Sequence, residues 1–195
     1  QWVSVVPYPQ DNINEYGGVF QGPIYAQYEI PNNPSAFVTV GWVQDNLVAY
    51  LTGEGYMRAG NGVQLDHAEA VKWYRLAAAQ GLAVAQSNLG FMYDNGRGVP
   101  QDYIQAVMWF RLAADQGFAP AQTNLGLMYV IGQGVPQEYA EAVKWFRLAA
   151  AGGYAPAQHN LGASYERGNG VQQDHAEAVK WYRLAALQGY ANAQT

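Results

Sequence analysis

The sequence predicts an all-α solenoid of tandem helix pairs, preceded by a shorter segment of a different kind. Two observations support this fold class: a 36-residue repeat that runs to the end of the chain, and helical spacing of the apolar residues within each copy. A third is a change of composition near residue 44. We therefore divide the 195 residues into an extended or β-stranded arm or cap, 1–44, and a repeat region, 45–195, with about four copies and a truncated fifth.

Composition narrows the classes of function. The chain has 10 Lys and Arg against 15 Asp and Glu, a formal net charge of -5, and 15 tyrosines. An acidic chain without a basic cluster is a poor match for nucleic-acid phosphates, and no apolar run approaches the ~20 residues that span a bilayer. The absence of cysteine excludes disulfides, thiolate nucleophiles and cysteine zinc sites. Many tyrosines with little charge favour an exposed surface used for contact.

Residues 1–44 read as short strands or extended segments. Three runs, 2–6, 18–30 and 36–42, are rich in β-branched and aromatic residues and lie between prolines, asparagines and aspartates. They could cap the first helix of the solenoid, or form an arm that pairs with another subunit. Residue 1 is Gln, so the chain is processed or a fragment. Signal-peptide removal is the favoured interpretation, and it predicts a secreted or cell-surface protein.

Each copy of the repeat contains one helix that ends at a glycine. Residues 67–78 (HAEAVKWYRLAA) return letter for letter at 175–186, three periods later. In the copy at 102–116 the apolar residues fall at helical spacing, Asp102 stands where a carboxylate caps a helix, and Gly117 where a helix ends. We expect the recurring tryptophans to be large apolar anchors packed between helices: Trp73, Trp109, Trp145 and Trp181.

A second helix follows in each copy, with the motif Asn-Leu-Gly-x-x-Tyr. Pro120 and Pro156 lie near its start, where proline has no hydrogen bond to lose. A glycine inside a helix costs roughly 1 kcal/mol against Ala, so its recurrence predicts that another helix backbone crosses there. Loops with Val99 or Val135 connect the copies, and we expect these valines to fill the gap between repeats. The expected core of this helix comprises Leu89, Leu125, Leu161, Gly90, Gly126, Gly162, Tyr93, Tyr129 and Tyr165.

The 36-residue period, the AEAVKWYRLAA helix, A-Q-x-N-L-G-x-x-Y and G-x-G-V together resemble the Sel-one-like repeat, a relative of the tetratricopeptide repeat. The resemblance covers about residues 45 to 195. It implies an α/α superhelix and a role in protein–protein assembly, and no shared catalytic residues. Some members are secreted and rich in cysteine, which this chain lacks. The first copy departs from the pattern, because the spacing after its expected first helix, 45–59, is one residue off.

The residues capable of chemistry form no recognisable site. His67 and His175 occupy the same repeat position three copies apart, so a solenoid keeps them distant, and metal-ligand spacing is absent. Ser164 lies in mid-helix rather than at a strand-to-helix elbow, and His159 is on a different helical face. The Gly96–Gly98 loop lacks the Gly-Lys-Ser/Thr of a phosphate loop. We therefore expect no catalytic residues, no metal and no cofactor.

Protein partners are the remaining expectation, most of all other copies of this chain. Residues 189–195 restart the repeat and no capping helix follows in the sequence, so the apolar side of the last full helix is expected to be uncovered. An end-to-end contact that does not close makes a filament or tube. The expected self-association residues are Trp2, Val3, Val5, Tyr8, Phe20, Tyr25, Leu184, Leu187 and Tyr190.

Two alternatives stay open beside this self-assembling, non-enzymatic scaffold. One is a monomeric solenoid adaptor that grips a peptide or protein partner on its concave face. The other is an enzyme, although no group of residues in the sequence indicates a catalytic site. In either binding role, partner contact is expected at positions that vary between copies: Tyr103, Ile104, Met108, Val130 and Ile131.

Overall fold

A computed structural model describes residues 2–6, 25–30, 33–40 and 66–190 of the 195-residue chain, with side chains in the last of these ranges. The chain divides into two compact units, Gln1–Gln80 and Gly81–Thr195, and each is described by itself. The expected first helix at 45–59 and the restarted repeat after residue 190 lie outside the described residues.

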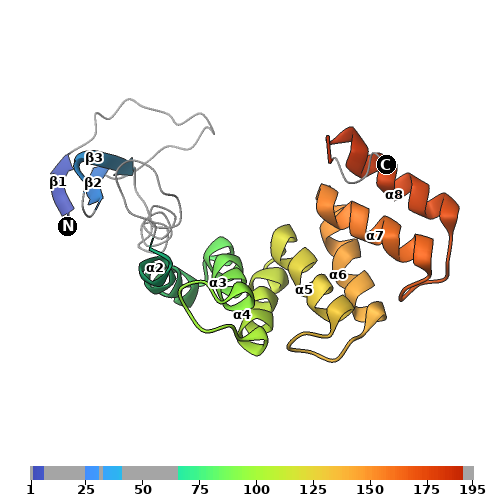
Figure 1. Cartoon of the computed structure of the whole chain (residues 1–195). Coiled ribbons are helices and arrows are strands. Elements are labelled where there is room, and N and C mark those ends of the chain that lie inside the picture. Colours follow the sequence, from blue (N-terminus) through green and yellow to red (C-terminus); the bar gives the residue numbers. More distant parts are fainter. Residues whose placement is uncertain (1, 7–24, 31–32, 41–65, 191–195) are drawn as a thin grey trace. The chain divides into compact units, whose positions relative to one another are not determined.

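In the first unit the described residues form a three-stranded antiparallel sheet and one helix (Figure 1). The strands are β1 (Trp2–Val6), β2 (Tyr25–Ile30) and β3 (Asn33–Val40), in the order β1-β2-β3. Strand β1 coincides with the first of the three runs expected to be extended, and β2 and β3 overlap the other two, with β3 starting earlier, at Asn33. Helix α2 (His67–Ala79) begins at Asp66, whose carboxylate accepts a 3.0 Å hydrogen bond from the Glu69 amide. This is the cap that the repeat pattern leads us to expect at each copy.

Residues 81–190 of the second unit form a run of six helices, each of 13 residues, that pack on their neighbours in chain order (Figure 1). The A helices carry the Asn-Leu-Gly motif and are α3 (Ala83–Asn95), α5 (Ala119–Ile131) and α7 (Ala155–Arg167). The B helices carry the tryptophans and are α4 (Tyr103–Asp115), α6 (Tyr139–Ala151) and α8 (His175–Leu187). Helices α5 and α7 also contact each other. The all-α solenoid predicted from the repeat is confirmed.

The core of this unit is built from leucines on the A helices and one aromatic residue on each of α4 and α6. Leu89, Leu125 and Leu161 are fully buried, as are the rings of Phe110 and Phe146. The tryptophans, expected as the large anchors, are only half-buried at positions 73, 109, 145 and 181. Successive helical residues point about 100° apart, so only one of two adjacent aromatic residues can face the centre. It is the residue after the tryptophan that does so.

The glycine inside each A helix makes room for an aromatic ring rather than for a helix backbone. A Cβ on Gly90 would lie 2.7 Å from the ring of Phe110, and a Cβ on Gly126 would lie 2.5 Å from the ring of Phe146. The expected backbone crossing is therefore wrong for these two glycines. At Gly162 a Cβ would meet the ring of Tyr182 at 2.9 Å and also the Ala178 carbonyl oxygen at 3.2 Å.

The loop between each A helix and the B helix that follows it is closed by a glutamine and shaped by glycine. Gln137 Nε2 donates a 2.7 Å hydrogen bond to the carbonyl of Val130, seven residues earlier. Gln101 and Gln173 donate in the same way to the carbonyls of Asp94 and Glu166. Gly134, with φ of 70°, lies so close to the Tyr103 carbonyl that a Cβ would collide with it. Val135 packs against the core, in agreement with its expected role, and Val99 is half-buried.

Candidate protein-interaction surfaces

The histidines and the serine that could carry chemistry lie apart or are bonded to their own helix. His159 is on α7, and His175 starts α8. The Ser164 hydroxyl donates a 2.9 Å hydrogen bond to the Asn160 carbonyl, one turn earlier. Among the described residues, no group of three or more His, Asp or Glu side chains could hold a metal ion, and no helix is long and apolar enough to cross a bilayer.

An apolar stripe runs along the outer face of α4. Ile104, Met108 and Leu112 are 70%, 41% and 43% exposed. They are four residues apart, so they lie on one line of the helix surface. The opposite line of α4, with Ala106, Phe110 and Ala113, is buried, which means that the stripe faces away from the core. We call Ile104, Met108 and Leu112 the α4 stripe.

Two residues of the α4 stripe, Ile104 and Met108, are departures of the second copy from the others, whereas Leu112 is an exposed leucine in every copy. In α6 the corresponding face carries Lys144, which forms an ion pair with Glu141, and in α8 Lys180 pairs with Glu177. In α4 the positions of the Glu–Lys pair are occupied by Gln105 and Met108. A charged surface of an exposed helix is thus replaced by an apolar one. Contiguous exposed apolar side chains are typical of protein contact sites.

The other positions that vary between copies divide into two groups. Ile131, at the end of α5, is more than half exposed. Tyr103 and Val130 are partly buried and pack against the core. The structure therefore leaves Ile104, Met108 and Ile131 accessible among the five positions proposed from the sequence.

The recurring arginines on the B helices are held by the tyrosines of the following A helix. Arg111 Nη2 donates a 2.5 Å hydrogen bond to Tyr129 Oη, and its guanidinium lies 6.0 Å from the centre of that ring. Arg147 donates to Tyr165 Oη at 3.0 Å in the next copy. These pairs join helices within the solenoid and contribute a cation–π contact as well as a hydrogen bond.

The last helix of the described region exposes apolar side chains. Leu184 is 44% and Leu187 84% exposed on α8. Tyr190 is half-buried, and its ring lies 5.5 Å from that of His159. Of the other residues expected to mediate self-association, Trp2, Val3 and Val5 are in β1 and Tyr25 is in β2, whereas Tyr8 and Phe20 lie outside the described residues.

His159 is enclosed by aromatic rings. The ring of Tyr182 is 5.3 Å away, and the His159 Nδ1 atom is buried with no hydrogen-bond partner in the described part of the chain. Burial, followed by the charge of Arg167, lowers the pKa of His159 below its ordinary value, and Glu166 acts in the opposite direction. Burial and a 3.0 Å hydrogen bond to Glu166 raise the pKa of Tyr182 to about 12. His159 is therefore held as a neutral, structural ring.

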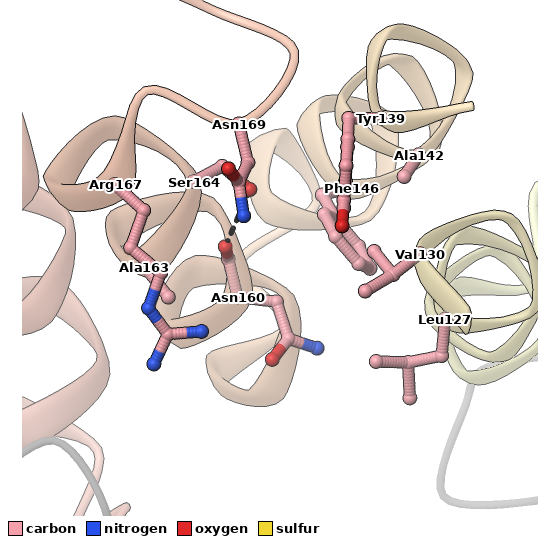
Figure 2. Close-up of a pocket in the computed structure, with 10 residues that line it drawn as sticks. All are labelled: Leu127, Val130, Tyr139, Ala142, Phe146, Asn160, Ala163, Ser164, Arg167 and Asn169. Atoms are coloured by element: carbon pink, nitrogen blue, oxygen red, sulfur yellow. Dashed lines mark hydrogen bonds between the residues drawn. The ribbon is translucent and has the colours of Figure 1, made fainter. Parts of the chain in front are cut away.

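A cavity of about 140 Å³ opens between α5, α6 and α7 (Figure 2). Its apolar wall includes Leu127, Val130 and Phe146, and polar groups of α7 lie across from this wall. We call it the α5–α7 cavity. Its ten lining residues are Leu127, Val130, Tyr139, Ala142, Phe146, Asn160, Ala163, Ser164, Arg167 and Asn169. Apart from Val130, none of them is on the list of contact positions expected from the sequence, although the small residues at 163 and 164 could have been seen by aligning the copies.

Paired helices of equal length, joined by equivalent loops, define this chain as an α/α repeat solenoid. The Sel1 repeat matches it four times, at residues 46–82, 83–118, 119–154 and 155–190. The chain belongs to the Sel1 repeat family, which confirms the resemblance noted from its motifs. Sel1 repeats form a non-catalytic scaffold fold for protein–protein interaction.

Two solved structures are similar to most of this chain. A protective antigen of uropathogenic Escherichia coli strains is 44% identical, with a TM-score of 0.72 over 76% of this chain and 32% of the antigen. A Sel1 repeat protein from Oxalobacter formigenes is 39% identical, with a TM-score of 0.71 over 76% of this chain and 59% of that protein. This chain thus spans less than two thirds of either relative.

A more distant structure shares the fold alone. Helicobacter pylori cysteine rich protein B is 20% identical, with a TM-score of 0.53 over 69% of this chain and 97% of that protein. The comparison with curated proteins gave no match.

Proposed function

We propose that this chain is a non-enzymatic scaffold that binds a protein partner through the α4 stripe. The observation that carries the proposal is the exposure of Ile104, Met108 and Leu112 on a helix whose equivalents carry Glu–Lys pairs. Apolar side chains at this spacing suit a partner that covers one face of the helix. Burying such side chains contributes roughly 25 cal/mol per Å² of apolar area, whereas leaving them in water contributes nothing to folding.

The test replaces the α4 stripe with the surface of the other copies. The variant Ile104→Ala/Met108→Lys carries at these two positions the residues found at the equivalent positions of α6, which are Ala140 and Lys144. Both changes are on an exposed face, so the fold should be kept. Tagged wild-type protein, incubated with an extract of the source cells, should retain a partner that the variant loses by about tenfold, equivalent to ~1.4 kcal/mol.

Quantitative mass spectrometry of the retained proteins provides the measurement. Lys144→Ala, a change on the same face of α6, is the matched control and should leave the partner in place. A set of retained proteins that is the same for wild type and the Ile104→Ala/Met108→Lys variant would contradict the proposal.

A second copy of the chain is the other candidate partner, and the exposed leucines of α8 favour it. Leu184 and Leu187 are three residues apart on one side of the helix and both are exposed. A head-to-tail contact through this surface would build a filament or tube, because a heterologous contact that does not close continues without limit.

Sedimentation velocity over a range of concentrations tests this candidate. The mass of the wild-type chain should rise with concentration, and Leu184→Glu/Leu187→Glu should keep it at that of one chain. Electron microscopy of the concentrated wild type should then show filaments. A wild-type chain that sediments as a monomer at every concentration would exclude this partner.

We also propose that the protein is secreted or displayed at the cell surface. The support is its 44% identity to a protective antigen present in uropathogenic Escherichia coli strains. Fractionation of the source cells, with a cytoplasmic enzyme as the marker, is the test. Recovery of the protein only with the cytoplasmic marker would overturn this location.

A further inference from the structure

The α5–α7 cavity is present because one copy lacks side chains that the others have. At the position of Ser164 the other copies carry Met92 and Met128, which are buried. At the neighbouring position Ala163 replaces a leucine, Leu127, and in the preceding copy a phenylalanine. The apolar volume that Met128 fills in the preceding copy is therefore left open beside α7.

Ser164 does not fill the cavity in another way. Its hydroxyl is turned to the carbonyl of Asn160 and donates a hydrogen bond of 2.9 Å within its own helix. The facing wall stays apolar, with Leu127 and Val130 on α5 and Phe146 on α6 (Figure 2). An occupant that presents an aliphatic side chain would restore the contacts that a methionine makes in the other copies.

The charge at this cavity selects among such occupants. Arg167 is the only charged residue of the ten that line it, and no ion pair of Arg167 is found in the part of the chain that the structure describes. A guanidinium has a planar set of donors that matches a carboxylate. The cavity thus offers an apolar wall for a side chain and a cation for an acid beside it.

We propose that the α5–α7 cavity binds a peptide segment of a partner protein in which a Leu, Ile, Met or Phe side chain stands next to Asp or Glu. The apolar side chain occupies the space left by Ala163 and Ser164, and the carboxylate pairs with Arg167. This inference rests on the proposed function, since it assumes a protein partner. It adds to the α4 stripe a second contact with the partner, and it specifies the partner sequence that this contact selects.

The experiment uses a display library of random linear peptides selected on the wild-type chain. The variant Ala163→Leu/Ser164→Met fills the cavity with the Leu127 and Met128 pair that α5 already has, so its helix should remain folded. Selection on the wild type should enrich an apolar residue next to Asp or Glu. Calorimetry with the most enriched sequence as a synthetic peptide should show binding about tenfold weaker to the filled variant.

Arg167→Gln is the second variant, because the side chain is exposed and its loss should not affect folding. It should weaken the same peptide by about tenfold, whereas Arg183→Gln, an exposed arginine on α8, should not. Equal binding of the peptide by the wild type and the filled variant would overturn the proposal. So would a selection that enriches nothing, or sequences without an acidic residue.

The outcomes separate this proposal from the proposed function. If the partner is lost by Ile104→Ala/Met108→Lys but still bound by the filled variant, the α4 stripe is a binding surface and the α5–α7 cavity is not. Wild-type oligomers that dissociate in the filled variant would place a segment of a second copy in the cavity, and would overturn its assignment to a different protein.

Discussion

Gln116 donates a 2.7 Å hydrogen bond from its Nε2 to Oε1 of Gln86, thirty residues earlier and in the preceding A helix. Gln188 makes the same bond to Gln158 at 2.9 Å. The acceptor glutamine is buried in both cases. The bond therefore ties the end of a B helix to the buried start of the A helix that precedes it.

The third copy lacks this bond, because Gly152 stands where Gln116 and Gln188 stand, opposite the buried Gln122. Gly152 has φ of -74°, and a Cβ there would meet its nearest atom at an ordinary 3.4 Å. We predict that Gly152→Gln raises the free energy of unfolding by about 1–2 kcal/mol in chemical denaturation. Gly152→Ala should show only the backbone part, about 0.4–1 kcal/mol. Equal gains for the two variants would argue against the bond.

The contact between Gly126 and Phe146 leads to a second prediction. Gly126→Ala should lower the free energy of unfolding by about 1–3 kcal/mol, although alanine is the better helix former, because the added Cβ meets the buried ring at 2.5 Å. In the background of Phe146→Leu the same change should cost less, or stabilise. A double-mutant cycle measured by urea unfolding checks this. A cost that is the same in both backgrounds would show that the ring is not the cause.

A third prediction concerns the start of α6. Asp102 and Asp174 each accept two hydrogen bonds from amides of the first turn, at 2.9 to 3.0 Å. Glu138 occupies the same position before α6 and makes no such bond, since its carboxylate is one methylene farther from the backbone. Glu138→Asp should therefore raise the free energy of unfolding by about 0.5–1 kcal/mol. The reverse change, Asp102→Glu, should lower it, and thermal unfolding of both variants measures the pair.

The partly buried ring of His159, whose Nδ1 atom is unpaired among the described residues, predicts a loss of stability in mild acid. Its pKa is lowered from 6.5 in the folded chain, so the unfolded chain takes up the proton first as the pH falls. The stability is complete above about pH 6.5, declines as the pH falls from there toward the lowered folded-state pKa, and levels off below it. The variant His159→Thr removes the titrating ring and introduces threonine, which the preceding copy has at the equivalent position as Thr123. The hydroxyl of Thr123 donates a hydrogen bond to a carbonyl of its own helix.

Unfolding by urea between pH 7.5 and 5 tests this dependence. The slope assigned to His159 should vanish in His159→Thr and persist in His175→Gln, a change at the exposed first residue of α8. A slope that survives His159→Thr would assign the acid sensitivity to other groups.

The repeat made the helices and their pairing predictable, because every copy places the same residues at the same spacing. Leu125 and Leu161 lie fully buried at positions singled out by that spacing. The period alone could not decide between Trp145 and Phe146, since both positions recur and both are aromatic. The choice depends on the direction in which α6 is turned by its neighbours. The same limit applies to Gly126, whose contact is a side chain twenty residues away.

The interaction surfaces were predictable only in part, because they arise from departures from the repeat. Met108 stands out in the sequence as an apolar residue at a lysine position, and it lies on the exposed α4 stripe. Position 103 varies as well, with Tyr in two copies and His in the other two, yet Tyr103 is half-buried, and only the packing of its helix shows this. Ser164 differs from the methionine of the preceding copies, and this is visible in the sequence. The cavity beside it is not, because its volume depends on the packing of three helices.

The glutamine that closes each loop has a consequence for how such a chain can change in length. Gln137 bonds to Val130 within one copy, so the junction is complete without residues from farther along the chain. A block of 36 residues can therefore be duplicated or deleted and bring its own working connection with it. Residues 67–78 and 175–186 are identical although three periods separate them. Growth by whole units lengthens the binding surface while every joint stays the same.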